Sequence, residues 1–79
     1  MWGPNPVSDQ MNLELAGNET GEIRILVWDQ LGQKMESFQV RKNLTVLEQT
    51  LELGKLLAGL YLLEVRLGKE VLTRKFVKH

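Results

Sequence analysis

Cysteine is absent from the sequence, and the single histidine, His79, is the last of its 79 residues. The lack of cysteine excludes disulfide bonds, thiol nucleophiles and thiolate metal sites. A histidine at a chain end is expected to be too mobile to serve as a positioned base or metal ligand. Asp9 and Asp29 fall in turn-like segments, where aspartate usually accepts hydrogen bonds from nearby backbone amides. These absences indicate a protein that is not an enzyme and that uses no cofactor or metal.

Net charge and long hydrophobic runs are also lacking. Ten basic and ten acidic residues cancel, so no overall field attracts nucleic acid or an anionic membrane. No apolar run approaches the roughly 18 residues that a membrane span requires. The charges are unevenly placed, however, because residues 1–65 hold five basic and nine acidic side chains whereas residues 66–79 hold five and one. This basic segment lacks the interleaved aromatic side chains of a nucleic-acid surface, so we expect no nucleic-acid partner.

The length of the chain indicates one small domain, because a chain of this size buries only about 60% of the surface that it exposes when unfolded. The segment Gly3-Pro4-Asn5-Pro6 cannot enter a helix or a central strand, since its two prolines lack an N–H donor and keep their neighbours extended. We interpret residues 1–6 as the end of an interdomain linker, or as residues added for expression. Residues 7–79 are then the domain itself, which we expect to be part of a longer protein.

Alternation of apolar and polar residues predicts short β-strands along most of the domain. The pattern covers residues 11–15, 22–29, 33–41, 61–67 and 71–77. Turn-forming residues separate these runs, among them Asp29 to Gly32, where Gly32 is suited to positive φ, and Gly68-Lys69. Strands at intervals of roughly 8–12 residues are typical of a small, all-β antiparallel sandwich. The inward positions that we expect to be buried are Ile23, Ile25, Val27, Leu63 and Val65.

Residues 44–58 fit two different structures. Leu44, Leu47 and Leu51 recur at helical spacing. Against a helix stand several β-branched residues and Gly54, since glycine inside a helix costs about 1 kcal/mol relative to alanine. The pattern alone leaves a helix and a strand followed by a turn equally open.

Five short motifs follow one another along the chain. They are Pro4-Asn5-Pro6, Val7–Leu13, the strand Ile23–Trp28 with Asp29 to Lys34 after it, the segment Leu53–Tyr61, and Thr73–Lys78. Their order and spacing resemble the type A C-terminal sorting domain of the type IX (Por) secretion system, and the resemblance extends from Pro4 to Lys78. Two positions depart from the family pattern: Gly3 replaces an aromatic residue, and Glu52-Leu53-Gly54 replaces Asp-x-Ser.

The resemblance implies an immunoglobulin-like sandwich of about seven strands, in which residues 44–58 form a strand to about Leu53 and then a short turn. It implies a C-terminal signal on a secreted cargo protein of a Gram-negative bacterium, recognised by the outer-membrane type IX machinery. The cargo, N-terminal to the domain, would pass through the periplasm and the outer membrane and be secreted or held at the cell surface. A sortase-type peptidase would remove the domain, commonly with attachment of the cargo to a surface lipopolysaccharide.

The positions that match the family motifs are the recognition residues that the resemblance implies. They are Asn5, Pro6, Gly32, Gly59, Tyr61, Lys75, Phe76, Val77 and Lys78. Gly59 is expected to have positive φ or to lie against neighbouring backbone, and to lead Tyr61 into a central strand where its hydroxyl finds a partner.

The last strand is expected to lie at a sheet edge. There the exposed charges of Lys75 and Lys78 would discourage aggregation. The same edge could be recognised by strand addition, or could pair two isolated domains in a weak homodimer.

Two other functions stay open on the residues alone. An immunoglobulin-like accessory module of a secreted protein could bind carbohydrate by stacking on Trp28, or could bind another protein. A spacer domain would have no specific partner.

Overall fold

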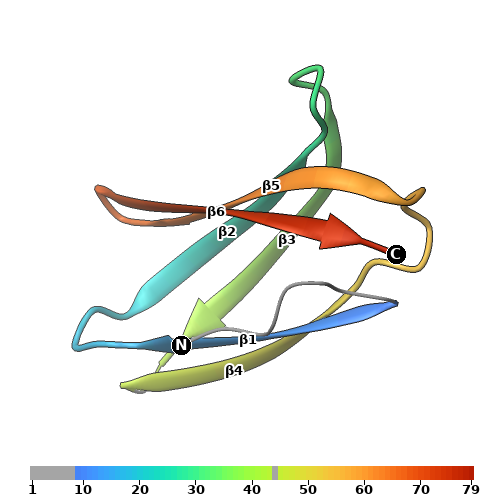
Figure 1. Cartoon of the computed structure of the whole chain (residues 1–79). Helices are drawn as coiled ribbons and strands as arrows, with labels where there is room; N and C mark the ends of the chain where they lie inside the picture. The colour runs from blue at the N-terminus through green and yellow to red at the C-terminus, as the bar shows by residue number, and fades with distance from the viewer. Residues whose placement is uncertain (1–8, 44) are drawn as a thin grey trace.

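The computed structural model describes residues 9–43 and 45–79, which form six β-strands and no helix (Figure 1). In chain order the strands are β1 (Gln10–Ala16), β2 (Gly21–Trp28), β3 (Lys34–Lys42), β4 (Val46–Glu52), β5 (Gly59–Leu67) and β6 (Glu70–Lys78). They make two antiparallel sheets, so the predicted all-β sandwich is confirmed. The predicted count of about seven strands is one more than the described residues form. These residues therefore contain no helical segment that could cross a membrane.

The ambiguous segment forms strand β4 and then a turn, as the resemblance implied. The Leu56 N–H donates to the Leu53 carbonyl at 3.1 Å and closes the turn. β-branched side chains restrict χ1 and favour extended backbone, and Gly54 weakens any helical continuation. The helical alternative is thus excluded for the described part of the segment, and residue 44 lies outside it.

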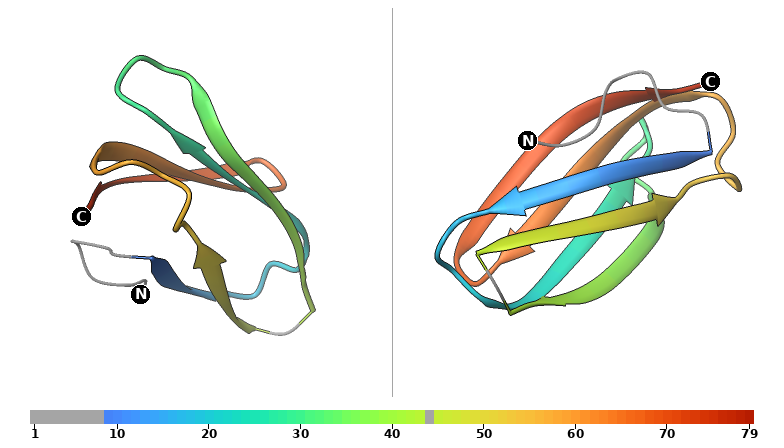
Figure 2. Two further views of the ribbon diagram at one scale, coloured as in Figure 1. Left: turned by 90° about the vertical axis from the view of Figure 1, so that its right-hand side faces the viewer. Right: turned by 90° about the horizontal axis from the view of Figure 1, so that it is seen from below.

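The larger sheet has the strand order β3-β2-β5-β6, and the smaller sheet pairs β1 with β4. The smaller sheet lies across one face of the larger one (Figure 2). β2 and β5 are the central strands of the larger sheet. Among the described strands β6 pairs only with β5, and it is the last strand in the order of the larger sheet.

The core lies between the two sheets, where alternate residues of each strand point inward. All five residues that the sequence pattern placed in the core are buried. The smaller sheet and the turn after it contribute Met11, Leu13, Leu51, Leu53 and Leu56, and β6 contributes Phe76. These residues form one apolar cluster that joins the two sheets, although the smaller sheet has only half as many strands.

A buried lysine joins the sheets at one end of the sandwich. Lys42 ends β3 and is only 1% exposed. Its Nζ donates to the backbone carbonyls of Gly17 at 2.7 Å and Glu19 at 2.8 Å, both in the loop between β1 and β2. The sequence pattern ended this strand at Arg41, whereas β3 continues to Lys42, whose inward side chain finds two acceptors.

We predict that Lys42→Ala lowers the free energy of unfolding by about 2–3 kcal/mol, because the buried lysine stem is lost and two backbone carbonyls lose a charged donor. Arg41→Ala is the matched control, since Arg41 is the preceding residue and is exposed. It should change stability by no more than about 0.5 kcal/mol. Urea denaturation of both variants measures the difference, and equal losses would contradict the role given to Lys42.

Candidate functional site

Seven of the nine sequence-predicted recognition residues lie in the described part of the chain; Asn5 and Pro6 lie outside it. Gly32 is in the turn between β2 and β3, the pair Gly59 and Tyr61 begins β5, and residues 75–78 end β6. Because β5 and β6 are antiparallel, the beginning of one strand meets the end of the other. Gly59 is the cross-strand partner of Lys78, and Tyr61 is the partner of Phe76.

The Tyr61 and Phe76 rings form the centre of this arrangement. Their centroids are 5.7 Å apart and the ring planes differ by 23°, which is a stacked pair. Phe76 is fully buried, and Tyr61 is 7% exposed. The Tyr61 hydroxyl donates to the Leu57 carbonyl at 2.6 Å, so the expectation that it would find a partner in a central strand is confirmed. This bond fixes the turn before β5 to the strand itself.

In the chain, Gly59 lies midway between Leu57 and Tyr61, the two residues that this hydrogen bond joins. Its backbone φ is +158°, a value that residues with a side chain rarely adopt. A Cβ at this position would be 3.9 Å from Tyr61 Cε2, which is ordinary contact. The prediction of positive φ is confirmed, and the constraint on the residue is the backbone conformation rather than lack of space.

Lys78 is not the exposed edge charge that the sequence indicated. It is 5% exposed and lies on the same inward face of β6 as Phe76. Its Nζ is 3.9 Å from Asp9 Oδ1, and the Asp9 carbonyl accepts a hydrogen bond from Leu53 N at 2.7 Å. Lys78 therefore joins the end of β6 to the beginning of the smaller sheet. The earlier expectation was wrong because a lysine on an inward position can extend its amine to the rim while burying its stem.

The turn that contains Gly32 has the geometry that its sequence predicts. Asp29 Oδ1 accepts hydrogen bonds from Leu31 N at 2.8 Å and Gln33 N at 2.9 Å. Gly32 has φ +81° and donates its N–H to the Asp29 carbonyl at 3.2 Å. Asp29 thus accepts hydrogen bonds from its own turn, as expected.

This turn and the start of β5 meet at one end of the sandwich. Residues 29–31 and 57–61 together line a shallow, open depression there. Leu31 and Leu57 are 84% and 81% exposed, and Leu60 and Val77 are also exposed on neighbouring strands. We call this region the motif end and define it as residues 29–32, 57–61 and 75–78. Sequence reasoning missed its exposed leucines, although each is an apolar residue in a predicted turn.

A comparison with protein-family models matches residues 3–79 to the secretion system C-terminal sorting domain. The chain belongs to this family. The match covers nearly the whole chain and confirms the resemblance inferred from the motifs. The domain is therefore a C-terminal signal for type IX secretion, and its cargo is secreted or held at the cell surface by way of the outer membrane. A search of curated proteins found no match.

In this sorting domain the motif residues divide into two groups. Tyr61, Phe76 and Lys78 are buried and hold the end together, whereas Lys75 and Val77 lie exposed on the outward face of β6. The described residues hold no group of three side chains that could bind a metal ion. The surface of the motif end combines exposed apolar side chains with the exposed Lys75.

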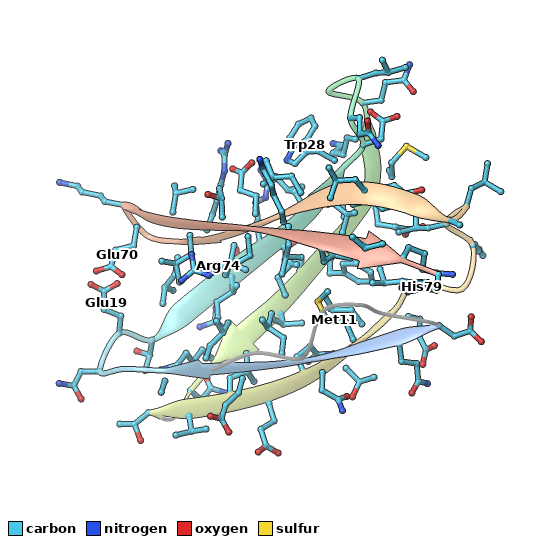
Figure 3. The ribbon with its side chains drawn as sticks, viewed as in Figure 1. Met11, Glu19, Trp28, Glu70, Arg74 and His79 are labelled. Atoms are coloured by element: carbon cyan, nitrogen blue, oxygen red, sulfur yellow. The ribbon has the colours of Figure 1, made fainter. Side chains whose placement is uncertain are left out.

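Trp28, the basis of the rival carbohydrate-binding prediction, has contacts within its own sheet. Trp28 is labelled in Figure 3, and its indole Nε1 donates to Glu64 Oε1 at 2.9 Å. The other carboxylate oxygen of Glu64 pairs with Arg66. Glu64 is 8% exposed although it lies on the outward face of the sheet. The indole N–H at the end of β2 therefore has a hydrogen-bond acceptor within the domain, and its position needs no carbohydrate ligand to explain it.

We predict that Gly59→Val destabilises the domain by about 1–3 kcal/mol, because a β-branched residue is strained at this backbone conformation. Gly54→Val is the control, since Gly54 lies in the preceding turn and its φ is not in the positive range. Thermal unfolding should show a lower melting temperature for the Gly59 variant than for the control. An unchanged melting temperature would mean that Gly59 is an ordinary strand position.

Proposed function

We propose that the type IX machinery recognises the folded domain at the motif end, and that the domain acts by binding and is not an enzyme. In this proposal the cargo lies N-terminal to the domain and reaches the machinery in the periplasm. A sortase-type peptidase then removes the domain once the cargo has crossed the outer membrane, and the cargo is attached at the cell surface.

One observation carries the proposal: motif segments from three separate parts of the chain meet at one end of the sandwich and expose apolar side chains there. Leu31, Leu57, Leu60 and Val77 all belong to this end. Clustered apolar side chains on the surface of a small domain usually mark a site of interaction with another protein. Folding is required to assemble the cluster, because no single segment contains it.

The end of β6 also belongs to this cluster, because Val77 is exposed beside its cross-strand partner Leu60. A receptor that covers these apolar side chains would therefore contact the last strand of the domain. The same apolar surface would allow isolated domains to form a weak homodimer at high concentration.

We predict that replacing Leu31 and Leu57 together by serine lowers export of the full-length cargo about fivefold or more, since about 1 kcal/mol of binding energy is lost. Both side chains are more than four-fifths exposed, so the fold should be unaffected. The measurement is the ratio of cargo at the cell surface to cargo in the periplasm, by fractionation and immunoblotting. Val46→Ser is the control, because Val46 is an exposed apolar residue on the smaller sheet.

Phe76→Ala tests the requirement for a folded domain. Loss of the stacked ring from the core should cost about 3–5 kcal/mol and hold the cargo in the periplasm. Deletion of residues 75–79 is less informative, because it removes two buried residues together with three exposed ones. Lys75→Ala by itself is the better test of the exposed basic charge. Normal export of both the Leu31/Leu57 variant and Phe76→Ala would refute recognition of a folded motif end.

Removal of the domain is tested on the exported protein. We expect mass spectrometry of surface cargo to find no peptides from residues 7–79, while periplasmic cargo retains them. In cells that lack the peptidase, the full-length chain should accumulate. Intact domain on mature surface cargo would contradict the proposed cleavage.

A further inference from the structure

The two outer faces of the sandwich carry opposite charges. Positions of the larger sheet that point away from the core hold five basic and two acidic side chains in the described part of the chain: Arg24, Lys34, Arg41, Arg66 and Lys75, with Glu22 and Glu64. Outward positions of the smaller sheet hold three acidic side chains and, among the described residues, no basic one: Glu14, Glu48 and Glu52. An acidic partner is therefore attracted to the larger sheet and repelled by the smaller one.

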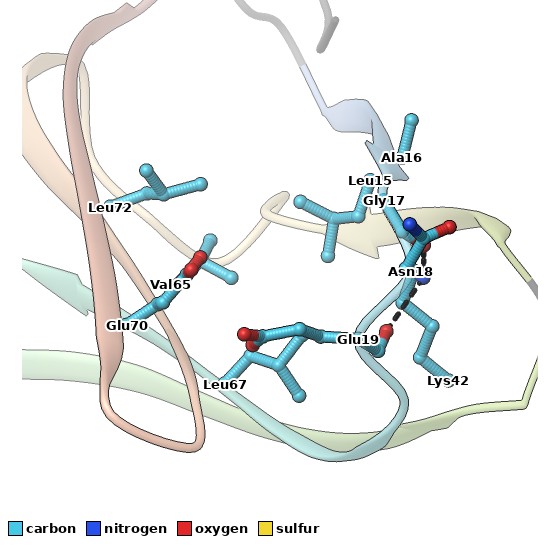
Figure 4. A pocket seen from close by; sticks show the side chains of 10 residues that line it. All are labelled: Leu15, Ala16, Gly17, Asn18, Glu19, Lys42, Val65, Leu67, Glu70 and Leu72. Atoms are coloured by element: carbon cyan, nitrogen blue, oxygen red, sulfur yellow. Dashed lines mark hydrogen bonds between the residues drawn. The ribbon is translucent and has the colours of Figure 1, made fainter.

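The two buried lysines add nothing to this outward charge. Lys42 and Lys78 point toward the smaller sheet and are 1% and 5% exposed. Figure 4 shows the hydrogen bonds that Lys42 donates to the carbonyls of Gly17 and Glu19. The Lys78 amine lies near the carboxylate of Asp9. The outward basic side chains are therefore the cations that a partner on the larger sheet would meet.

Two of the outward arginines lie directly opposite each other. Arg24 in β2 and Arg66 in β5 are cross-strand partners, and both are exposed. Partners on one face of an antiparallel pair have Cβ atoms about 5 Å apart, so two positive charges there repel and lower stability. Arg24 forms no ion pair with the described residues. An anion between the two guanidinium groups would remove this repulsion.

Arg66 is held in position by a buried carboxylate. Its Nε donates to Glu64 Oε2, and Glu64 Oε1 accepts the Trp28 indole N–H at 2.9 Å. The Arg66 side chain is nevertheless 51% exposed, and its Nη groups donate no hydrogen bond to the described residues. Arg66 therefore presents oriented N–H donors to an acceptor outside the domain.

The charged groups around this pair are mixed rather than uniformly basic. Glu22 lies two residues before Arg24 on the same face of β2 and is the cross-strand partner of Arg41. Binding to an anionic membrane is typical of clusters of about four to eight basic residues, and lipid phosphates on this face would meet Glu22 as well as the arginines. A partner protein can place one carboxylate at Arg24 and Arg66 and keep clear of Glu22. The mixed charges therefore favour a protein over a lipid surface.

We propose that the outward face of β2 and β5 binds an acidic segment of a partner protein, with one aspartate or glutamate carboxylate between Arg24 and Arg66. A planar guanidinium binds a carboxylate through two parallel hydrogen bonds, and arginine is common among the residues that contribute most to protein interfaces. Val71, the cross-strand partner of Arg66, is 53% exposed and offers an apolar contact to the residue beside that carboxylate.

This surface is separate from the motif end. Arg66 lies six residues along β5 from Leu60, which is about 20 Å of extended chain. None of Arg24, Arg66 and Val71 belongs to the residues that define the motif end. The proposal therefore does not depend on recognition there.

Titration of the ¹⁵N-labelled 79-residue chain with a synthetic peptide tests the proposal. The probe has blocked termini and a single glutamate flanked by valines and serines, and glutamine replaces the glutamate in the control peptide. We expect saturable shifts at the backbone amides of Arg24, Arg66 and Val71 and at the Nε–H groups of both arginines. The glutamate peptide should bind about fivefold tighter than the control, as expected for an exposed ion pair. Added salt should reduce this difference.

Two variants that change the net charge equally locate the site. Arg24→Gln should abolish the preference for the glutamate peptide, whereas Arg41→Gln should retain most of it. Both arginines are exposed on the same face of the larger sheet. Thermal unfolding checks the fold, and Arg24→Gln should not lower the melting temperature, because it removes one of two facing like charges.

Four results would overturn the proposal. They are equal binding of the two peptides, equal loss of the preference in the two variants, tighter Arg24-dependent binding to vesicles of phosphatidylglycerol and phosphatidylcholine than to the glutamate peptide, and self-association that Arg24→Gln abolishes. The second would mean that diffuse charge attracts the peptide. The third would make a membrane the occupant, and the fourth would make it the acidic face of a second copy.

Discussion

The structure depends on one constraint: a sheet of two strands must cover the apolar face of a sheet of four strands. Because there are no disulfide bonds, the two sheets are held together by apolar contact between inward side chains and by polar contacts at their margins. At the centre of the sandwich the cover is complete, since Ile23, Ile25 and Phe76 are inaccessible to solvent. Toward the start of β6 the cover ends, and that is where Leu72 meets solvent. The buried core and the exposed Leu72 are two results of the same mismatch in width.

Two lysines secure the margins that apolar contact leaves open. Lys42 reaches carbonyl oxygens in the loop after β1, and Lys78 reaches the aspartate before β1. One acts at each end of β1, and both extend from the larger sheet. Each buries a long aliphatic stem, so the residue that is most typical of protein surfaces contributes here to the interior. The smaller sheet is therefore attached to the larger one by a lysine at each end of β1 as well as by the apolar contact between their inward faces.

The strands could be predicted from the sequence because their inward positions alternate without interruption, as in Ile23, Ile25 and Val27. The turn at Asp29 to Gly32 could also be predicted, because all of its hydrogen bonds join residues that are close together in the chain. The roles of Lys42 and Lys78 could not be predicted, because the acceptors that draw them inward lie far away in the chain. For the same reason no spacing rule places the turn of Gly32 beside the start of β5. The family resemblance identified the motif residues but not their division into buried supports and exposed surface.

The pairing of β1 with β4 has a consequence for the order of folding. Its partners are separated by 30 residues at Ala16 and Val46 and by 42 at Gln10 and Glu52. In contrast, β5 and β6 are joined by a hairpin whose nearest partners, Leu67 and Glu70, are three residues apart. Closing a long loop loses more chain entropy than closing a short one, so local hairpins form first and distant strands pair late. The contact between Asp9 and Lys78 is therefore among the last to form, and a domain that has made it has completed its folding from one end of the described chain to the other.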